Sequence, residues 1–251
     1  MDLSIIICVY NEELAVKNNI FKLNYALRKF NMDFEIIVVN DGSIDATESR
    51  INEMKKNMAA LKVVSYKKNR GKGYAIKKGV EKAEGTYILY TDIDLAYPVD
   101  QIPFFLKKIK ESSADAVIGS RLLTGSSYII TSDAFKTVYL RHCVSRVFNF
   151  MTRMLLGLKV KDTQCGIKCF KNSILKMFTN RQRINGFCFD VELLTMAKLS
   201  NCRVVQIPVT VIHSIKSSKV RLLRDSFIML NDILRIKKYQ VLGVYNFNGE
   251  I

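Results

Sequence analysis

The chain has 251 residues, 49% of them hydrophobic, which is enough for the packed core of one α/β domain or two small ones and excludes a disordered chain. Its 39 Lys and Arg residues exceed its 23 Asp and Glu residues, so the formal charge of +16 predicts an anionic partner: phosphate, nucleic acid or an acidic membrane surface. The apolar run from Ile5 to Tyr10 is not exceeded elsewhere and is far shorter than the roughly 20 residues that cross a bilayer.

Short β-branched runs alternate with helical patterns over the first 120 residues. The runs at 4–10, 34–41, 61–66, 86–92 and 115–120 are typical of buried parallel strands, and helix-like stretches lie between them at about 12–30, 45–58, 72–84 and 98–111. This alternation predicts an α/β fold with an open, mostly parallel sheet flanked by helices, whose ligands bind beyond the carboxyl ends of the strands.

The pattern changes after Ser120. A helix is predicted over 133–156, packed through an apolar stripe whose members are spaced by three and four residues: Leu140, Val144, Val147, Met151 and Met154. A turn-rich stretch (161–170), a helix near 189–200, a strand at 203–211 and a final helix over about 219–238 follow.

The final helix is basic and amphipathic. Its bases Arg221, Arg224, Arg235 and Lys238 fall within one arc, beside an apolar stripe. This arrangement suits a helix lying in a membrane interface and equally a helix packed on the core with a solvated basic face. We expect one domain over 1–215 and a helical extension over 216–251 packed on or beside it.

Asp92 and Asp94 follow the predicted strand at 86–92. Two carboxylates this close repel each other unless a cation lies near them, and carboxylates suit hard ions such as Mg²⁺ or Mn²⁺, which bridge diphosphate oxygens. The alternative is that the pair only caps the turn after the strand. The position at a strand end favours the metal site.

Two further patches suit a nucleotide. Gly71 and Gly73 flank Lys72 where a strand joins a helix, and glycines let backbone amides approach phosphate. The alternative is a glycine-rich turn whose basic side chains are only solvated. Asp41 ends the second strand, where its carboxylate can accept a hydrogen bond from a nucleobase imide.

These patches, in order with Tyr10-Asn11-Glu12, resemble the N-terminal signature of the family 2 glycosyltransferases, inverting enzymes with a GT-A fold and nucleotide-sugar donors. The segments 119–121 (GSR), 162–170 (DTQCGIKCF), 186–194 (GFCFDVELL) and 217–220 (SSKV) are similar to the branch that makes polyprenyl-phosphate sugars, nearest to dolichyl-phosphate β-glucosyltransferases. The chain departs from the family at Asn40, Ile93 and Ser217, and none of these departures removes a metal carboxylate.

The resemblance implies a role for each matching residue. Asp92 and Asp94 would hold the metal, Asp94 chiefly. The donor would contact a set of residues in the first strand-end loops and near the last helix: Tyr10, Glu12, Asp41, Gly71, Lys72, Gly73, Asp92 and Lys219. Arg121 would stabilise the departing diphosphate, and Asp162 would be the base or acceptor-side carboxylate, or else a turn cap. Arg141 and Arg146 would hold a phosphate acceptor, unless they only solvate their helix.

The resulting hypothesis is transfer of a hexose, glucose first, from a UDP-sugar to a polyprenyl phosphate at an anionic membrane surface. Mannose transfer from GDP-mannose and transfer to a glycan hydroxyl are alternatives within the family. A nucleotidyltransferase would show a basic glycine-rich loop after the first strand, and a nucleic-acid-binding module would show a binding motif; neither is present, so no nucleic-acid partner is expected. The N-terminus lacks the basic region of a secretory signal, so a peripheral protein at the cytoplasmic face is expected. No oligomeric state is predicted.

Overall fold

The computed structural model describes residues 1–130, 135–213 and 222–247. The larger sheet consists of β1 (Leu3–Val9), β2 (Phe34–Asp41), β3 (Leu61–Tyr66), β4 (Tyr87–Asp92), β5 (Ala116–Ser120), β7 (Lys168–Lys171) and β8 (Val204–Pro208), and the smaller one of β6 (Ser127–Ile130) and β9 (Thr210–His213). The helices are α1 (Val16–Lys29), α2 (Thr47–Lys55), α3 (Lys72–Val80), α4 (Ile102–Ser112), α5 (Phe135–Leu156), α6 (Asn172–Arg181), α7 (Phe189–Leu199) and α8 (Leu222–Val241), with a 3-10 turn η1 (Val99–Gln101) before α4.

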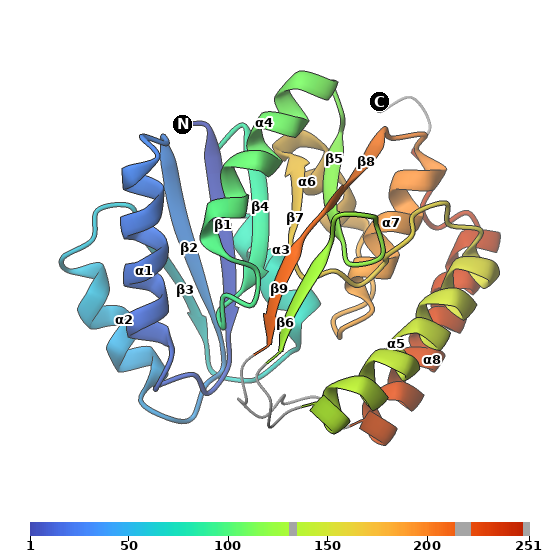
Figure 1. Cartoon of the computed structure of the whole chain (residues 1–251), viewed down its shortest axis with the longest axis horizontal. Coiled ribbons are helices and arrows are strands. Elements are labelled where there is room, and N and C mark those ends of the chain that lie inside the picture. Colours follow the sequence, from blue (N-terminus) through green and yellow to red (C-terminus); the bar gives the residue numbers. More distant parts are fainter. Residues whose placement is uncertain (131–134, 214–221, 248–251) are drawn as a thin grey trace.

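The larger sheet has the strand order β3-β2-β1-β4-β7-β5-β8 (Figure 1). β1 runs parallel to both β2 and β4, β2 runs parallel to β3, and β5 runs parallel to β8. Only β7 among these described strands is reversed, because it pairs antiparallel with β4 on one side and β5 on the other. The predicted mostly parallel sheet is therefore confirmed.

Both faces of this sheet are covered by helices, which explains why β1 and β2 are apolar at nearly every position. Ile5 and Ile7 pack in one core with Ile20 of α1, whereas Ile6 points to the other face and packs in a second core with Ile76 of α3. Successive side chains of a strand point to opposite faces, so a continuous apolar run serves both cores.

The second half differs from its predicted elements. The predicted strand at 203–211 is two strands, because Pro208 ends the pairing of β8 with β5 and Val209 carries the chain into the smaller sheet. Proline has no amide hydrogen to donate to a ladder. The strands β6 and β7 and the helix α6 were not predicted. In β7 the fully buried Lys168 masks the apolar pattern of a strand.

The prediction that α5 packs through its apolar stripe was wrong for the residues whose side chains are described. Val147, Met151 and Met154 are exposed at 61%, 44% and 70%, whereas the helix buries Asn149 and Thr152. The core-facing side of α5 is therefore polar in part, and its apolar side faces outward. Leu140 and Val144 have side chains outside the described part of the chain.

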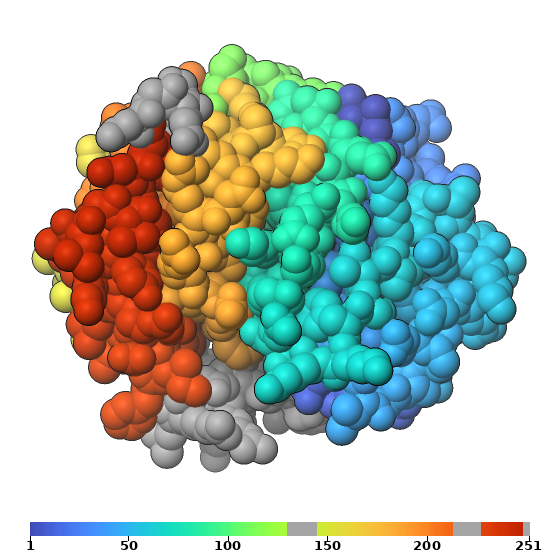
Figure 2. Space-filling view, turned by 180° about the vertical axis from the view of Figure 1, so that it is seen from behind, coloured from blue at the N-terminus to red at the C-terminus, as the bar shows by residue number. Residues whose placement is uncertain are grey.

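The last helix packs on the main body. α8 contacts α5 and α7, and its Ile233 and Ile236 are buried in the core that α3 and α7 share. Beyond α8, the Phe247 ring lies 5.5 Å from the Phe178 ring of α6, and Figure 2 shows the red surface of α8 beside the gold surface of α6. The division of the chain at residue 215 stays a prediction. Within the described ranges, no helix has the length and apolarity that a bilayer span needs.

Candidate active site

Asp92 and Asp94 lie at the carboxyl edge of the sheet, as their positions in the sequence predict. Asp92 ends β4 opposite Cys8 of β1, and the chain then turns so that the Ala96 amide donates to Asp94 Oδ1 at 3.0 Å. Asp94 stays exposed, but the surrounding protein removes part of its water; this desolvation and, second, the negative charge of Asp92 raise the pKa of Asp94. A nearby cation would relieve this repulsion.

Lys72, the first residue of α3, supplies a positive charge beside this pair. Its Nζ lies 2.6 Å from Asp92 Oδ1. Burial opposes the charged form of the lysine, but the carboxylates of Asp92 and Asp190 outweigh burial and raise the pKa of Lys72. The expected contact between Lys72 and donor phosphate stays a prediction, while the structure shows the lysine neutralising Asp92.

Asp41 organises the glycine-containing loop. It is 4% exposed, and its two carboxylate oxygens accept the amides of Arg70 at 2.8 Å and Gly71 at 2.9 Å. Gly71 has a φ of +97°, and a Cβ there would lie 2.5 Å from the Asn185 carbonyl oxygen. The Gly73 amide donates to that same carbonyl oxygen at 2.8 Å. Both glycine amides therefore donate to protein oxygens in this structure, and their expected contact with phosphate stays a prediction.

The loops after β1 and β2 are tied to each other. The amide of Glu12 donates to Thr47 Oγ1 at 2.8 Å, and the amide of Ile44 donates to Asn11 Oδ1 at 2.9 Å. Asn40 Oδ1 accepts the Ser43 amide at 3.1 Å and so shapes the second loop. Tyr10 is 37% exposed at this edge. The donor roles of Tyr10 and Glu12 stay predictions.

Arg121 and Asp162 form a buried pair at the end of β5. Arg121 Nε donates to Asp162 Oδ2 at 2.7 Å and its Nη2 donates to Oδ1 at 2.9 Å, while the Arg121 amide adds a third bond at 3.0 Å. Burial alone would raise the pKa of Asp162, but these bonds and the guanidinium charge prevail and lower it. A carboxylate held this way is a weak base, which argues against the expected function of Asp162 as the general base.

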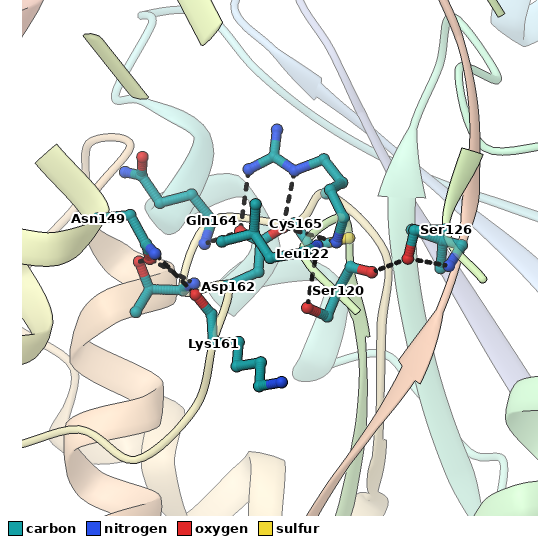
Figure 3. Close-up of polar contacts among 12 residues, drawn as sticks. Ser120, Leu122, Ser126, Asn149, Lys161, Asp162, Gln164 and Cys165 are labelled. Atoms are coloured by element: carbon teal, nitrogen blue, oxygen red, sulfur yellow. Dashed lines mark hydrogen bonds and ion pairs between the residues drawn. The ribbon is translucent and has the colours of Figure 1, made fainter. Parts of the chain in front are cut away.

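The loop that carries Asp162 is anchored to α5. Figure 3 shows Asn149 of α5 facing the backbone at Lys161 and Asp162, and Asn149 Nδ2 donates to the Lys161 carbonyl at 2.7 Å. Asn149 Oδ1 accepts both the amide and the hydroxyl of Thr163, at 3.0 and 2.9 Å. The sequence carried no signal for Asn149, because a single Asn in a helix has no distinguishing pattern.

Gly166 joins this loop to the acidic pair. A Cβ at Gly166 would overlap Asp92 Oδ2, and the Gly166 amide donates to the Tyr97 hydroxyl at 3.0 Å. The loop therefore passes directly beside Asp92, at a distance that only a glycine allows. Deeper in the core, Lys168 Nζ lies 2.7 Å from Asp190 Oδ1, which also accepts the Tyr90 hydroxyl at 2.6 Å. This buried pairing was not predicted.

The residues expected to hold the acceptor are only partly described. Arg146 is exposed on α5. Burial raises the pKa of Tyr128 on β6, and the charges of Arg121 and Arg146 both oppose that rise, so the two guanidinium groups act on the same region. Arg141 lies in α5 with its side chain outside the described part of the chain, and Lys219 lies outside it altogether.

The acidic pair fits a divalent ion that a substrate helps to hold. Three or more His, Cys, Asp or Glu side chains do not converge on one point among the residues with described positions. Mg²⁺ is, however, usually bound by one or two carboxylates together with water and substrate phosphates. Asp92 and Asp94 supply such oxygens, and a glycine at 166 lets the neighbouring loop approach without displacing the Asp92 carboxylate.

Two curated proteins of the same name resemble this chain in sequence. The chain is 30% identical to the dolichyl-phosphate beta-glucosyltransferase of Saccharomyces cerevisiae over an alignment that covers 98% of this chain and 77% of the relative. It is 29% identical to the protein of the same name from Dictyostelium discoideum, with 98% and 77% aligned.

Solved structures share the fold. Glucosyl-3-phosphoglycerate synthase from Mycobacterium tuberculosis, in complex with UDP, superimposes with a TM-score of 0.67 at 18% identity, covering 95% of this chain and 79% of that one. The same enzyme in complex with Mn²⁺, UDP-glucose and phosphoglyceric acid gives a TM-score of 0.65 at 17% identity, with 95% and 79% covered. The expected GT-A-type fold is confirmed. The profile of the family described as glycosyl transferase family 2 matches residues 4–178, and the chain belongs to this family.

Proposed function

We propose that the protein is an inverting glucosyltransferase that moves glucose from UDP-glucose to a polyprenyl phosphate of the dolichyl type. The names of the two relatives described above support glucose and the lipid phosphate, and the UDP-glucose complex of the M. tuberculosis enzyme supports the donor. The same names favour glucose over mannose.

On the donor side, the chain's own residues balance the charge of a diphosphate. Asp92 and Asp94 would hold Mg²⁺ or Mn²⁺, which acts as a Lewis acid on the leaving diphosphate. Lys72 already lies 2.6 Å from Asp92 Oδ1 and balances its charge. Asp94, whose pKa is raised, gains most from the ion because its charge is otherwise opposed by partial desolvation and by Asp92.

On the acceptor side, one observation carries the proposal: Asp162 is clamped by Arg121 and its pKa is lowered. A sugar hydroxyl needs a base to remove its proton during attack, whereas a phosphate monoester already carries negative oxygen at neutral pH. The phosphate oxygen attacks the anomeric carbon, the bond from that carbon to the UDP oxygen breaks, and UDP leaves with the bonding electrons. No proton has to be removed, so a phosphate acceptor fits the clamped carboxylate better than a glycan hydroxyl does.

A lipid phosphate acceptor implies work at a membrane surface, and we propose the cytoplasmic face because nucleotide sugars are the donors. Arg146 would meet the acceptor phosphate from α5, on the side where Arg121 also acts. Tyr10, Glu12, Asp41 and the loop around Lys72 would surround the nucleotide. A domain over 1–215 with a packed extension over 216–251 remains our proposed division of the chain.

The test is release of UDP from UDP-glucose with a water-soluble short-chain prenyl phosphate, compared with the matching prenyl alcohol. We expect release with the phosphate, dependent on Mg²⁺ or Mn²⁺, and little with the alcohol. Equal rates with the alcohol would overturn the phosphate acceptor, and release of GDP from GDP-mannose in place of UDP would overturn the donor. Asp94→Ala is the negative control. Salt-sensitive retention of RNA or DNA by this variant, without any binding of nucleotide sugar by the wild type, would instead favour a nucleic-acid-binding protein.

A further inference from the structure

Two adjacent helices turn apolar side chains toward solvent. The α5–α8 apolar face comprises Val147, Phe150 and Met154 on α5 and Phe227, Leu234 and Val241 on α8, whose exposed fractions run from 53% to 75%. The two helices contact each other and lie side by side in Figure 1. Exposed apolar side chains that gather on two adjoining helices mark an interaction site, unlike exposed apolar side chains that stand singly.

Among the side chains of α5 and α8 that the structure describes, the exposed charges are all positive. α5 contains no acidic residue, and Arg146 is exposed on it. At about 100° per residue, the two lysines lie at opposite margins of the apolar face of α8, Lys238 beside Phe227 and Lys237 beyond Leu234. Both lysines are exposed. Asp232 of α8 does not oppose them, because it is 6% exposed and paired with Arg235 at 3.1 Å.

The same helix reaches the acceptor side of the site. One side of α5 bears Phe150 and Met154, while the other side holds the Asp162 loop through Asn149. Arg146 lies at the edge of the face, and its charge, like that of Arg121, opposes the rise in the pKa of Tyr128 that burial causes. An acceptor that is anionic at one end and apolar along its chain would find both surroundings on this one helix.

We infer that the α5–α8 apolar face docks on an anionic lipid bilayer. This inference rests on the proposed function, since the prenyl chain of the acceptor lies in a bilayer. Apolar side chains would enter the interface while the lysines and arginine reach the anionic headgroups. A second copy of the chain is a poorer occupant, because a two-fold contact would place Arg146 and the lysines against their own counterparts.

The experiment is sedimentation of the full chain with vesicles of phosphatidylcholine alone or mixed with phosphatidylglycerol. We expect the wild type to bind the mixed vesicles, less so as salt is raised. The double variant Phe227→Ser/Leu234→Ser should lose about tenfold or more in partition coefficient. The matched control is Tyr25→Ser/Phe104→Ser, which removes side chains exposed at 72% and 64% on α1 and α4 and should bind as the wild type does. Melting curves verify that both variants are folded.

Unchanged binding of the α8 variant, or equal binding to pure phosphatidylcholine, would overturn the inference. So would a wild-type dimer in light scattering that the α8 variant dissociates, because a second copy would then cover the face. Failure of the inference is distinguishable from failure of the proposed function. UDP release with the soluble short-chain phosphate but no vesicle binding refutes docking alone, and vesicle binding without UDP release from UDP-glucose refutes the function alone.

Discussion

Replacing Asp162 by Asn should destabilise the protein strongly at neutral pH and much less in acid. Asp162 is 2% exposed and Arg121 is 23% exposed, and the two are joined by a bidentate contact at 2.7 and 2.9 Å. Removing one partner of a buried ion pair costs about 3–5 kcal/mol, and we expect about 3 kcal/mol because water still reaches part of the arginine. For a chain of this length that corresponds to a fall in Tm of about 6–12 °C.

The pH dependence follows from the lowered pKa of Asp162. Its ordinary value is 3.8, and the folded value lies below it. A group with a depressed folded pKa contributes stability above its unfolded pKa and loses that contribution as pH falls through the folded pKa. The difference in the free energy of unfolding between wild type and Asp162→Asn should therefore be complete at pH 7 and shrink below about pH 4.

Urea denaturation at a series of pH values measures this difference directly. The control is Asp100→Asn, an exposed carboxylate, which should change the free energy of unfolding by less than about 0.5 kcal/mol. An equally small change in the free energy of unfolding for Asp162→Asn at pH 7 would refute the claim that the Arg121–Asp162 ion pair stabilises the fold. Stability that is lost only above neutral pH would refute the sign of the pKa shift, and with it the argument that Asp162 is too weak a base for a hydroxyl acceptor.

Three further substitutions test other contacts. Asp94→Asn should raise the Tm of the metal-free protein, because a carboxylate with a raised folded pKa destabilises the fold above its unfolded pKa. The same substitution should reduce UDP release about 100-fold. A lower Tm of the metal-free variant would contradict the first expectation. Gly73→Ala should cost about 1–3 kcal/mol in urea denaturation, since its Cβ would lie 2.6 Å from Phe189 Cβ, whereas Gly186→Ala, with its nearest neighbour at 3.5 Å, should be nearly neutral. Asn149→Ala should cost about 1–3 kcal/mol and raise the KM for the phosphate acceptor while Kd for UDP is unchanged; an unchanged KM would leave Asn149 a purely structural residue.

The acidic pair and the parallel sheet were predictable because both depend on short-range pattern. Runs of β-branched residues separated by amphipathic stretches define parallel strands, and parallel strands bring their carboxyl ends, here Asp41 and Asp92, to one edge whatever the exact strand order. The family resemblance extended this to Arg121 and Asp162, and the structure brings those two together. Whether Asp162 acts as a base stays a prediction, because basicity depends on its partner Arg121 and not on its place in a motif.

Contacts across the fold were decided by tertiary packing. Lys72 meets Asp92 because α3 begins beside the end of β4, and Asn149 meets the Asp162 loop because α5 crosses it. The outward orientation of the apolar side of α5 is of the same kind: spacing identifies a stripe, but only the neighbours of a helix determine which side is buried. Local pattern thus specifies elements and strand ends, while the pairing of charges and the burial of a helix face arise from segments far apart in the chain, whose approach no local pattern encodes.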